Sequence, residues 1–112
     1  MQRGEVWLAT WPADPALKAR PVLIVSNDFR NSAPHLHDVV VAKLTGLNRP
    51  DGTRKPVNRA EDLVIRFRKD TIIRCASLYS VEKKILTRKI ARLTPSQMNE
   101  IDDRLRTVLL LT

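Results

Sequence analysis

The chain of 112 residues contains a single cysteine, Cys75. One thiol excludes an internal disulfide framework and leaves no cysteine pair at the spacing of a zinc site. Cys75 lies within the apolar segment TIIRCASL, where a small buried side chain is the expected role. We therefore expect Cys75 to be structural and not a nucleophile.

Long apolar runs are also missing from the sequence. No run approaches the roughly 18 residues that a helix needs to cross a bilayer. The N-terminal sequence MQRGEVW lacks the apolar stretch of a secretory signal. We therefore expect a cytoplasmic protein without a membrane partner.

Glycine is scarce, and the three glycines are Gly4, Gly46 and Gly52. The sequence has no Gly-rich loop that could cradle a nucleotide phosphate and no Gly-x-Ser-x-Gly turn that would carry a nucleophilic serine. The familiar templates for nucleotide binding and serine hydrolysis are therefore absent.

Histidine is equally rare, and both histidines stand in the segment HLHD. His35 and His37 would project to the same side of an extended chain, as two metal ligands or an acid–base pair would require. No third ligand is apparent, so we favour surface histidines over a metal site. The sequence predicts no metal and no cofactor.

Positive charge, in contrast, is abundant. The chain has 20 Lys and Arg against 12 Asp and Glu, which gives a net charge of +8 and a pI of about 10.4. This balance favours a polyanionic partner such as nucleic acid or an acidic peptide, although many proteins with a basic surface bind neither. The length is that of one domain, and we predict a single domain over residues 1–112.

Five short runs of β-branched, aromatic and apolar residues predict strands. They cover residues 5–11, 21–26, 38–44, 62–67 and 71–78. Four or five short strands favour a small barrel or a strongly bent sheet. The sequence thus predicts a mainly β fold.

The last segment predicts a helix. Thr94 can cap it, Pro95 suits its first position, and Gln97 completes a capping box. Apolar residues then recur at helical spacing and predict one stripe that packs on the sheet: Met98, Ile101, Leu105, Val108 and Leu109. The neighbouring pair Asp102 and Asp103 is interpreted as part of a solvated face and not as an acid–base pair.

A long basic segment, residues 45–61, separates the third and fourth predicted strands. It carries two glycines and two prolines, and five Lys or Arg stand between Lys43 and Arg59. The composition predicts a mobile loop. Such a loop is often functional, and a flexible surface insertion is the alternative.

Three polar residues near strand ends form a candidate site. Arg20 precedes the second strand, Thr45 follows the third, and Arg74 lies within the fifth. A guanidinium presents a planar fork of donors that suits a phosphate, and a hydroxyl can add a further hydrogen bond. Spacing alone leaves open that Arg20 pairs with Asp14 or Asp28, that Thr45 caps a turn, and that Arg74 is an ordinary surface residue.

At these residues the sequence resembles a known family, the PemK/MazF toxin endoribonucleases. The resemblance spans nearly the whole chain, in the order RGEVWLATWP, RPVLIVSND, VVVAKLTG, IIRCASLYSVEKKIL and LTPSQMNEIDDRLRTVLLL. The most specific parts are the opening Arg-Gly-acid-apolar-Trp and the Arg-Pro before the second strand.

The resemblance implies an SH3-like small barrel of the PemK/MazF/CcdB type with a C-terminal helix, assembled as a homodimer. It also implies sequence-specific, metal-independent cleavage of single-stranded RNA. Attack by the ribose 2′-hydroxyl would leave a 2′,3′-cyclic phosphate and a 5′-hydroxyl, so neither a protein nucleophile nor a cofactor is required. A cognate antitoxin with an acidic or amphipathic C-terminal segment would block the RNA groove.

By this resemblance Arg20 and Thr45 are the expected catalytic residues, and Arg74 matches a second arginine in a family Arg-Cys-Asp motif. Here Ala76 replaces the acidic residue of the motif, which removes a candidate proton carrier. A guanidinium is a poor base, so charge stabilisation is the expected role of Arg20. RNA binding and charge stabilisation are further expected at Arg74, Lys43, Arg49, Arg54, Lys55 and Tyr79.

Tyr79 is a candidate to stack on a base, and the same two interpretations hold for Trp11 and Phe29, since a half-buried aromatic is the common alternative. Because the acidic residue is replaced by Ala76, a second hypothesis remains: the protein is a non-cleaving toxin or binding module of the same fold, either gyrase-inhibitor-like or RNA-binding only. The third hypothesis is a basic barrel whose main role is to hold an acidic partner chain.

Overall fold

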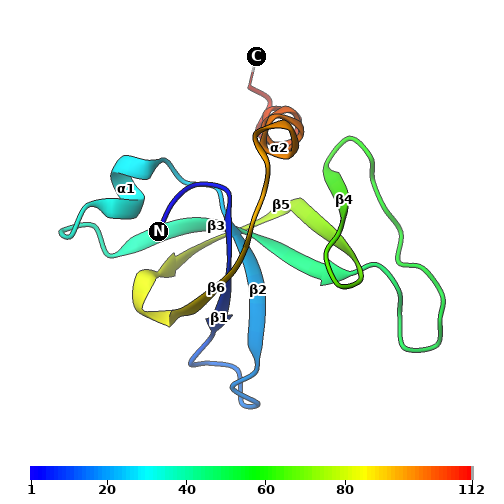
Figure 1. Ribbon diagram of the computed structural model, residues 1–112, viewed down its shortest axis with the longest axis horizontal. Coiled ribbons are helices and arrows are strands. Elements are labelled where there is room, and N and C mark those ends of the chain that lie inside the picture. The colour runs from blue at the N-terminus through cyan, green and yellow to red at the C-terminus, as the bar shows by residue number, and fades with distance from the viewer. Residues whose placement is uncertain (112) are drawn as a thin grey trace.

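The computed structural model describes residues 1–111, in which six strands form one antiparallel sheet (Figure 1). The strands are β1 (Glu5–Thr10), β2 (Ala19–Ile24), β3 (Asp38–Gly46), β4 (Asp62–Arg66), β5 (Asp70–Glu82) and β6 (Leu86–Arg92). Their order across the sheet is β4-β5-β3-β2-β1-β6. Two α-helices, α1 (Asp28–Ser32) and α2 (Pro95–Leu109), and a short 3-10 helix, η1 (Lys83–Ile85), complete the fold.

The sheet bends strongly but does not close. Its end strands, β4 and β6, are not hydrogen-bonded to each other. β2 and β3 pair over only three residues, Val22–Ile24 against residues 41–43, and β1 and β2 run down the view of Figure 1 whereas β3 runs across it. The mainly β fold with a C-terminal helix is therefore confirmed, as an open bent sheet and not as a closed barrel, because the two halves splay where β2 and β3 stop pairing.

Three elements were absent from the sequence prediction: β6, α1 and the short η1. β6 has the sequence LTRKIAR and pairs only with β1 at the sheet edge, so its side chains are mostly exposed and no apolar run marks it. α1 has five residues, too few for a helical period, and is defined by its cap: the Asn27 side chain accepts from the Arg30 N–H. β5 also extends to Glu82, beyond the predicted run.

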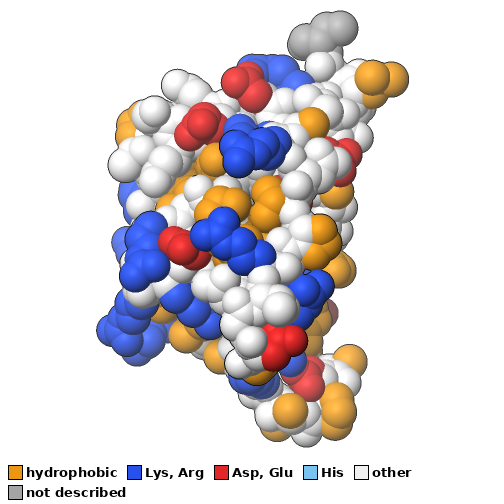
Figure 2. All heavy atoms as spheres, turned by 90° about the vertical axis from the view of Figure 1, so that its right-hand side faces the viewer, with side chains coloured by type: hydrophobic (Ala, Val, Ile, Leu, Met, Phe, Trp, Pro, Cys, Tyr) orange, Lys and Arg blue, Asp and Glu red, His pale blue; other side chains and the backbone are white. Residues whose placement is uncertain are grey.

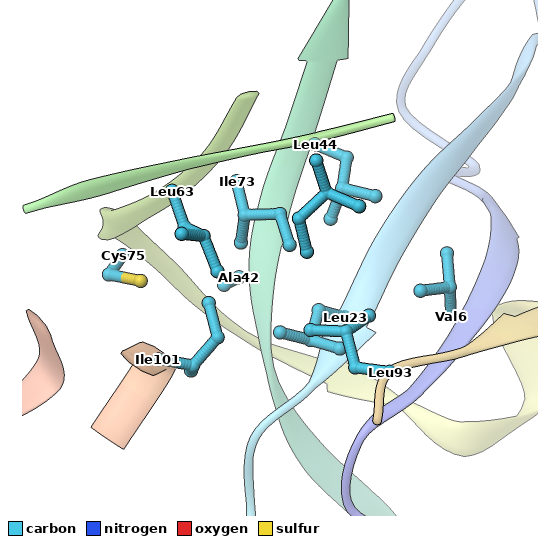
Figure 3. Close-up of a cluster of buried hydrophobic side chains, with 10 residues drawn as sticks. Val6, Leu23, Ala42, Leu44, Leu63, Ile73, Cys75, Leu93 and Ile101 are labelled. Atoms are coloured by element: carbon cyan, nitrogen blue, oxygen red, sulfur yellow. The ribbon is translucent and has the colours of Figure 1, made fainter. Parts of the chain in front are cut away.

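The sheet buries side chains on both faces. On one face α2 covers a cluster that includes Leu23, Ile73, Cys75 and Ile101 (Figure 3). The predicted helix is confirmed with its capping box, in which Thr94 and Gln97 exchange hydrogen bonds of 2.9 and 3.1 Å. Ile101 is fully buried and anchors the helix on the sheet.

The opposite face, here called the site face, has its own buried cluster. Its members are Ala9, Val22, Ile24, Val39, Val41, Val81 and Leu86. Because alternate residues of a strand point to opposite faces, neighbours of these residues at i±2 also lie on the site face. Two clusters on opposite faces fix which side chains of β2, β3 and β5 point each way.

The Arg-Gly-acid sequence at the N-terminus ties the helices to the sheet. The Arg3 N–H donates to Asp28 Oδ1 at 2.6 Å, and the Arg3 guanidinium bonds Val25 O and Asp102 Oδ1. The hydrogen bond from the Arg3 backbone is the main cause that lowers the pKa of Asp28. Asp102 is therefore an ion-pair partner of Arg3 and not simply part of a solvated face, whereas Asp103 is exposed as expected.

Gly4 follows at a position that only glycine fits. Its φ of +92° lies in the left-handed region, and a Cβ there would stand 3.3 Å from Met98 Cγ. This close approach seats the start of α2 on the first strand.

None of the helices within residues 1–111 combines the length and apolar character that spanning a membrane would require.

We predict that Cys75 is unreactive in the folded protein. The thiol is completely buried, and burial raises its pKa from 9.0 to about 11. A raised pKa means that folding favours the neutral thiol, so this stabilisation is complete below pH 9 and is lost as the pH rises toward 11. At pH 8 a thiol reagent should label the protein only in denaturant, and Cys75→Ala should flatten the loss of stability between pH 9 and 11. Rapid labelling without denaturant contradicts this.

Candidate functional site

The strand register brings Arg20 and Thr45 to the same end of the site face. Val22 of β2 is paired with Lys43 of β3. Arg20 lies two residues before Val22, and Thr45 lies two residues after Lys43 on the antiparallel neighbour. Both side chains therefore share the face of Val22 and lie beyond the last β2–β3 pair, where the strands diverge.

A pocket of about 200 Å³ opens on this face. Its lining comes from the end of β1, β2, β3 and β5 and consists of Trp11, Arg20, Pro21, Val22, Lys43, Leu44 and Tyr79. The Trp11 and Tyr79 rings meet edge to face with centroids 6.2 Å apart. The pocket thus joins two cations to a pair of aromatic rings, and four of the candidates named from the sequence meet there: Trp11, Arg20, Lys43 and Tyr79.

Arg20 is half exposed, and Asp14 is its acidic partner. Arg20 NH2 lies 3.7 Å from Asp14 Oδ2, and Asp14 Oδ1 accepts from the Ala16 N–H at 3.0 Å, which fixes the carboxylate in the β1–β2 loop. The pairing with Asp14 that the sequence left open is present, whereas Asp28 is bound to Arg3. An exposed pair at this distance contributes little stability, so a phosphate can displace it.

The Thr45 hydroxyl contacts the long loop instead of capping a turn. Lys55 Nζ lies 2.6 Å from Thr45 Oγ1, and the Lys55 N–H donates to Leu47 O at 2.8 Å. The main chain of Lys55 is thus tied to the end of β3. Thr45 is partly buried beneath this contact.

The loop of residues 47–61 has more internal structure than its composition predicts. Asn48 and Arg54 form an isolated bridge, and the Arg49 N–H donates to Thr53 O at 2.7 Å. The Arg49 guanidinium donates to Arg54 O at 3.0 Å, so this side chain stabilises the loop turn, while the Arg54 side chain is exposed. These contacts give the loop a defined turn, while its predicted mobility stays a prediction.

Arg74 lies next to Lys43 on the site face but is held by Asp62. The register pairs Lys43 with Arg74 and Arg74 with Asp62 across β3, β5 and β4. Arg74 NH1 donates to Asp62 Oδ2 at 2.8 Å and to Pro56 O at 3.1 Å. The Asp62 side chain is 5% exposed and the Arg74 side chain 26%, so the carboxylate is removed from water and the guanidinium is partly buried.

Asp62 is a site residue that sequence reasoning missed. Arg74 and Asp62 are 12 positions apart and meet only through the β4–β5 register. The carboxylate that the family motif leads one to expect at Ala76 is absent, and the partner of Arg74 comes from the neighbouring strand instead. An acidic residue opening a predicted strand opposite an arginine is the signal that could have suggested it.

The remaining candidates lie apart from this pocket. His35 stacks edge to face with Phe29 beside α1, at a centroid distance of 6.4 Å, and His37 lines a separate cavity. Within residues 1–111 no group of three or more His, Cys, Asp or Glu is placed to hold a metal ion.

The other face of the sheet carries a larger cavity, of about 580 Å³. Its lining includes Val6, Leu44, Phe67, Arg68 and Arg88, and none of the predicted site residues. Figure 2 views the side with β4 and the long loop, where Lys and Arg side chains gather in several clusters around exposed apolar atoms. Positive charge is thus spread over this side and not confined to the pocket.

Comparison with known proteins decides the family. Residues 2–109 match the model of the PemK-like, MazF-like toxins of type II toxin–antitoxin systems. The chain belongs to this family. The predicted resemblance is therefore confirmed.

The individual relatives share less than 30% sequence identity with this PemK/MazF toxin. A curated protein named probable endoribonuclease MazF2, from Mycobacterium tuberculosis strain ATCC 25618 / H37Rv, is 28% identical over 95% of each chain. An endoribonuclease from a mycobacterial species, solved in complex with its cognate antitoxin, is 28% identical with a TM-score of 0.76 and covers 100% of this chain and 97% of its own. The Mycobacterium tuberculosis toxin MazF-mt6 is 22% identical, covers 96% of this chain and 98% of its own, and with a TM-score of 0.73 supports the fold.

We predict that Asp62→Asn destabilises the toxin more than a matched change at the surface. The substitution leaves the partly buried Arg74 without its anion, which should lower the free energy of unfolding by about 2 kcal/mol. Asp70→Asn removes the same charge from the exposed pair with Arg66 and should cost less than about 1 kcal/mol. Urea unfolding of both variants measures the difference. Equal losses would show that the Asp62–Arg74 pair stabilises the fold no more than the exposed Asp70–Arg66 pair does.

Proposed function

We propose that this toxin is a sequence-specific endoribonuclease that cleaves single-stranded RNA at the pocket of Arg20, Lys43 and Tyr79. The observation that carries the proposal is the half-exposed Arg20 guanidinium, held at the divergence of β2 and β3 beside a second cation and an aromatic pair. Relatives with the same fold are named endoribonucleases, which supports the same activity here.

The pocket suits a single strand and not a duplex. Its cations attract the phosphate backbone, and the exposed Tyr79 ring offers a face on which a base can stack. Base–aromatic stacking is worth about 1–3 kcal/mol per base. Bases must be unpaired to reach such a ring, so the substrate is a loop or an unstructured messenger.

The reaction uses the RNA itself as nucleophile. The 2′-oxygen loses its proton and attacks the adjacent phosphorus, the P–O5′ bond breaks, and the departing 5′-oxygen takes up a proton. The products end in a 2′,3′-cyclic phosphate and a 5′-hydroxyl. Arg20 stabilises the charge that accumulates on the phosphorane oxygens, and Thr45 adds a hydrogen bond to one of them. This role for positive side chains requires no metal ion.

Neutralisation by an antitoxin completes the proposal. A relative was solved with its cognate antitoxin, and the net charge of +8 suits an acidic or amphipathic segment of such a partner. We further propose a homodimer in the cytoplasm, with residues 1–112 forming one domain. A segment that covers Arg20 and Tyr79 would exclude RNA.

A non-cleaving toxin or RNA-binding module of the same fold is the second candidate. Ala76 favours it, because the family motif has a carboxylate there that could carry a proton. Asp14, 3.7 Å from Arg20, is the carboxylate that this chain offers beside the guanidinium instead.

Arg20→Ala should abolish cleavage and leave the fold intact, since loss of the charge-stabilising donor costs about 100-fold or more. The test is primer extension on a long transcript treated in EDTA, with product 5′ ends labelled by a kinase without prior phosphatase treatment to detect 5′-hydroxyls. Arg106→Ala, which removes an exposed arginine of α2, is the control and should cleave like wild type. RNA that is bound but uncut by wild type would favour the second candidate.

A further inference from the structure

The long loop delivers a charged donor to the threonine of the site. We propose that Lys55 is a positioning residue for Thr45: its ammonium holds the hydroxyl oxygen and turns the hydroxyl proton toward a phosphate oxygen of the RNA. This inference rests on the proposed endoribonuclease function. It gives the loop a role in the reaction itself, beyond attraction of the RNA backbone.

The chemistry of the two side chains fixes which of them donates the hydrogen bond and which accepts it. A lysine ammonium only donates, so Thr45 Oγ1 accepts across the 2.6 Å contact. The hydroxyl has one proton, and because the Lys55 ammonium cannot accept it, this proton is free to be donated elsewhere. A charged donor also polarises the hydroxyl, which makes it a better donor to an anionic phosphate.

A chain of buried and backbone contacts places Lys55 at this point. The N–H of Lys55 is bonded to Leu47 O, and the carbonyl of the next residue, Pro56, accepts from Arg74 NH1. Arg74 is itself fixed by Asp62, which is almost fully buried. Both sides of the Lys55 main chain are therefore anchored to the sheet, and the ammonium is held in place before RNA binds.

This arrangement gives Arg74 an indirect role in the reaction. Its guanidinium is shared between a carboxylate and a loop carbonyl, so it orients the loop that carries Lys55. The second arginine of the motif thus acts in this chain through the loop and not as a free charge for RNA.

The test is a double-mutant cycle on single-turnover cleavage at saturating RNA. Lys55→Met keeps the length of the side chain and should lower the maximal rate on the order of 10-fold, with little change in the RNA concentration for half-maximal rate. In a Thr45→Val background the same change should cost nothing further, because the group that Lys55 orients is gone. Lys55→Arg, which restores a donor, should recover part of the rate.

Arg59→Gln is the matched control. Arg59 is an exposed residue of the same loop, so the variant removes the same charge without touching Thr45. If Lys55→Met affects the maximal rate no more than Arg59→Gln, or if its effect is fully additive with Thr45→Val, the inference is wrong. Circular dichroism and urea midpoints of each variant establish that it is folded.

A spectroscopic readout separates this inference from the proposed function. In wild-type protein labelled with [15N]lysine, the Lys55 ammonium should exchange slowly with water, and Thr45→Val should remove that protection. If the ammonium spectrum is unchanged by Thr45→Val, the Lys55 contact and the inference fail, whether or not RNA is cut. If wild type has the protected ammonium but cuts no RNA, the proposed function fails and the role of Lys55 in cleavage fails with it.

Discussion

Burial on both faces of the sheet is the constraint on which the site depends. β2, β3 and β5 each place apolar side chains alternately under α2 and in the cluster of the site face. A slip of one residue would exchange the two sets and expose both cores, so the register is strongly specified. The pairs Val22 with Lys43 and Lys43 with Arg74 follow from that register, and with them the common face of Arg20 and Thr45.

The site lies where this constraint ends. β2 and β3 pair for three residues and then diverge, so Arg20 and Thr45 are free of the β2–β3 ladder, although Arg20 still pairs with Ala9 of β1 and Thr45 with Ile72 of β5. Polar side chains there cost little stability, and the splayed strands leave room for the pocket. The same open geometry that prevents closure of a barrel thus gives Arg20 access to an extended ligand.

The sequence predicts the local parts of this structure well. The capping box of α2 needs only residues 94–97, and the apolar runs mark five of the strands; the buried Cys75 follows from its apolar neighbours. β6 could not be predicted because an edge strand with exposed side chains has no apolar run. α1 could not be predicted because a single helical turn is too short to show the helical periodicity of apolar residues. An element can be predicted from the sequence where the contacts that stabilise it join residues close in the chain.

The contacts within the site are not local, which is why they could not be predicted. Arg20 and Thr45 were recognisable as candidates from the residues around them and from the family pattern. Asp62 as partner of Arg74, and Lys55 as partner of Thr45, depend on strand register and on the path of a long loop, and spacing gives neither. The aromatic pair of Trp11 and Tyr79 likewise requires two strands that are separated in the sheet.

The most direct test of this account is a crystal structure of the protein with a single-stranded oligonucleotide made uncleavable by 2′-O-methyl riboses. The account predicts a backbone phosphate bound by Arg20 and Thr45 on the site face, with a base on the Tyr79 ring. A strand bound instead on the opposite face, in the cavity lined by Phe67, Arg68 and Arg88, would contradict it.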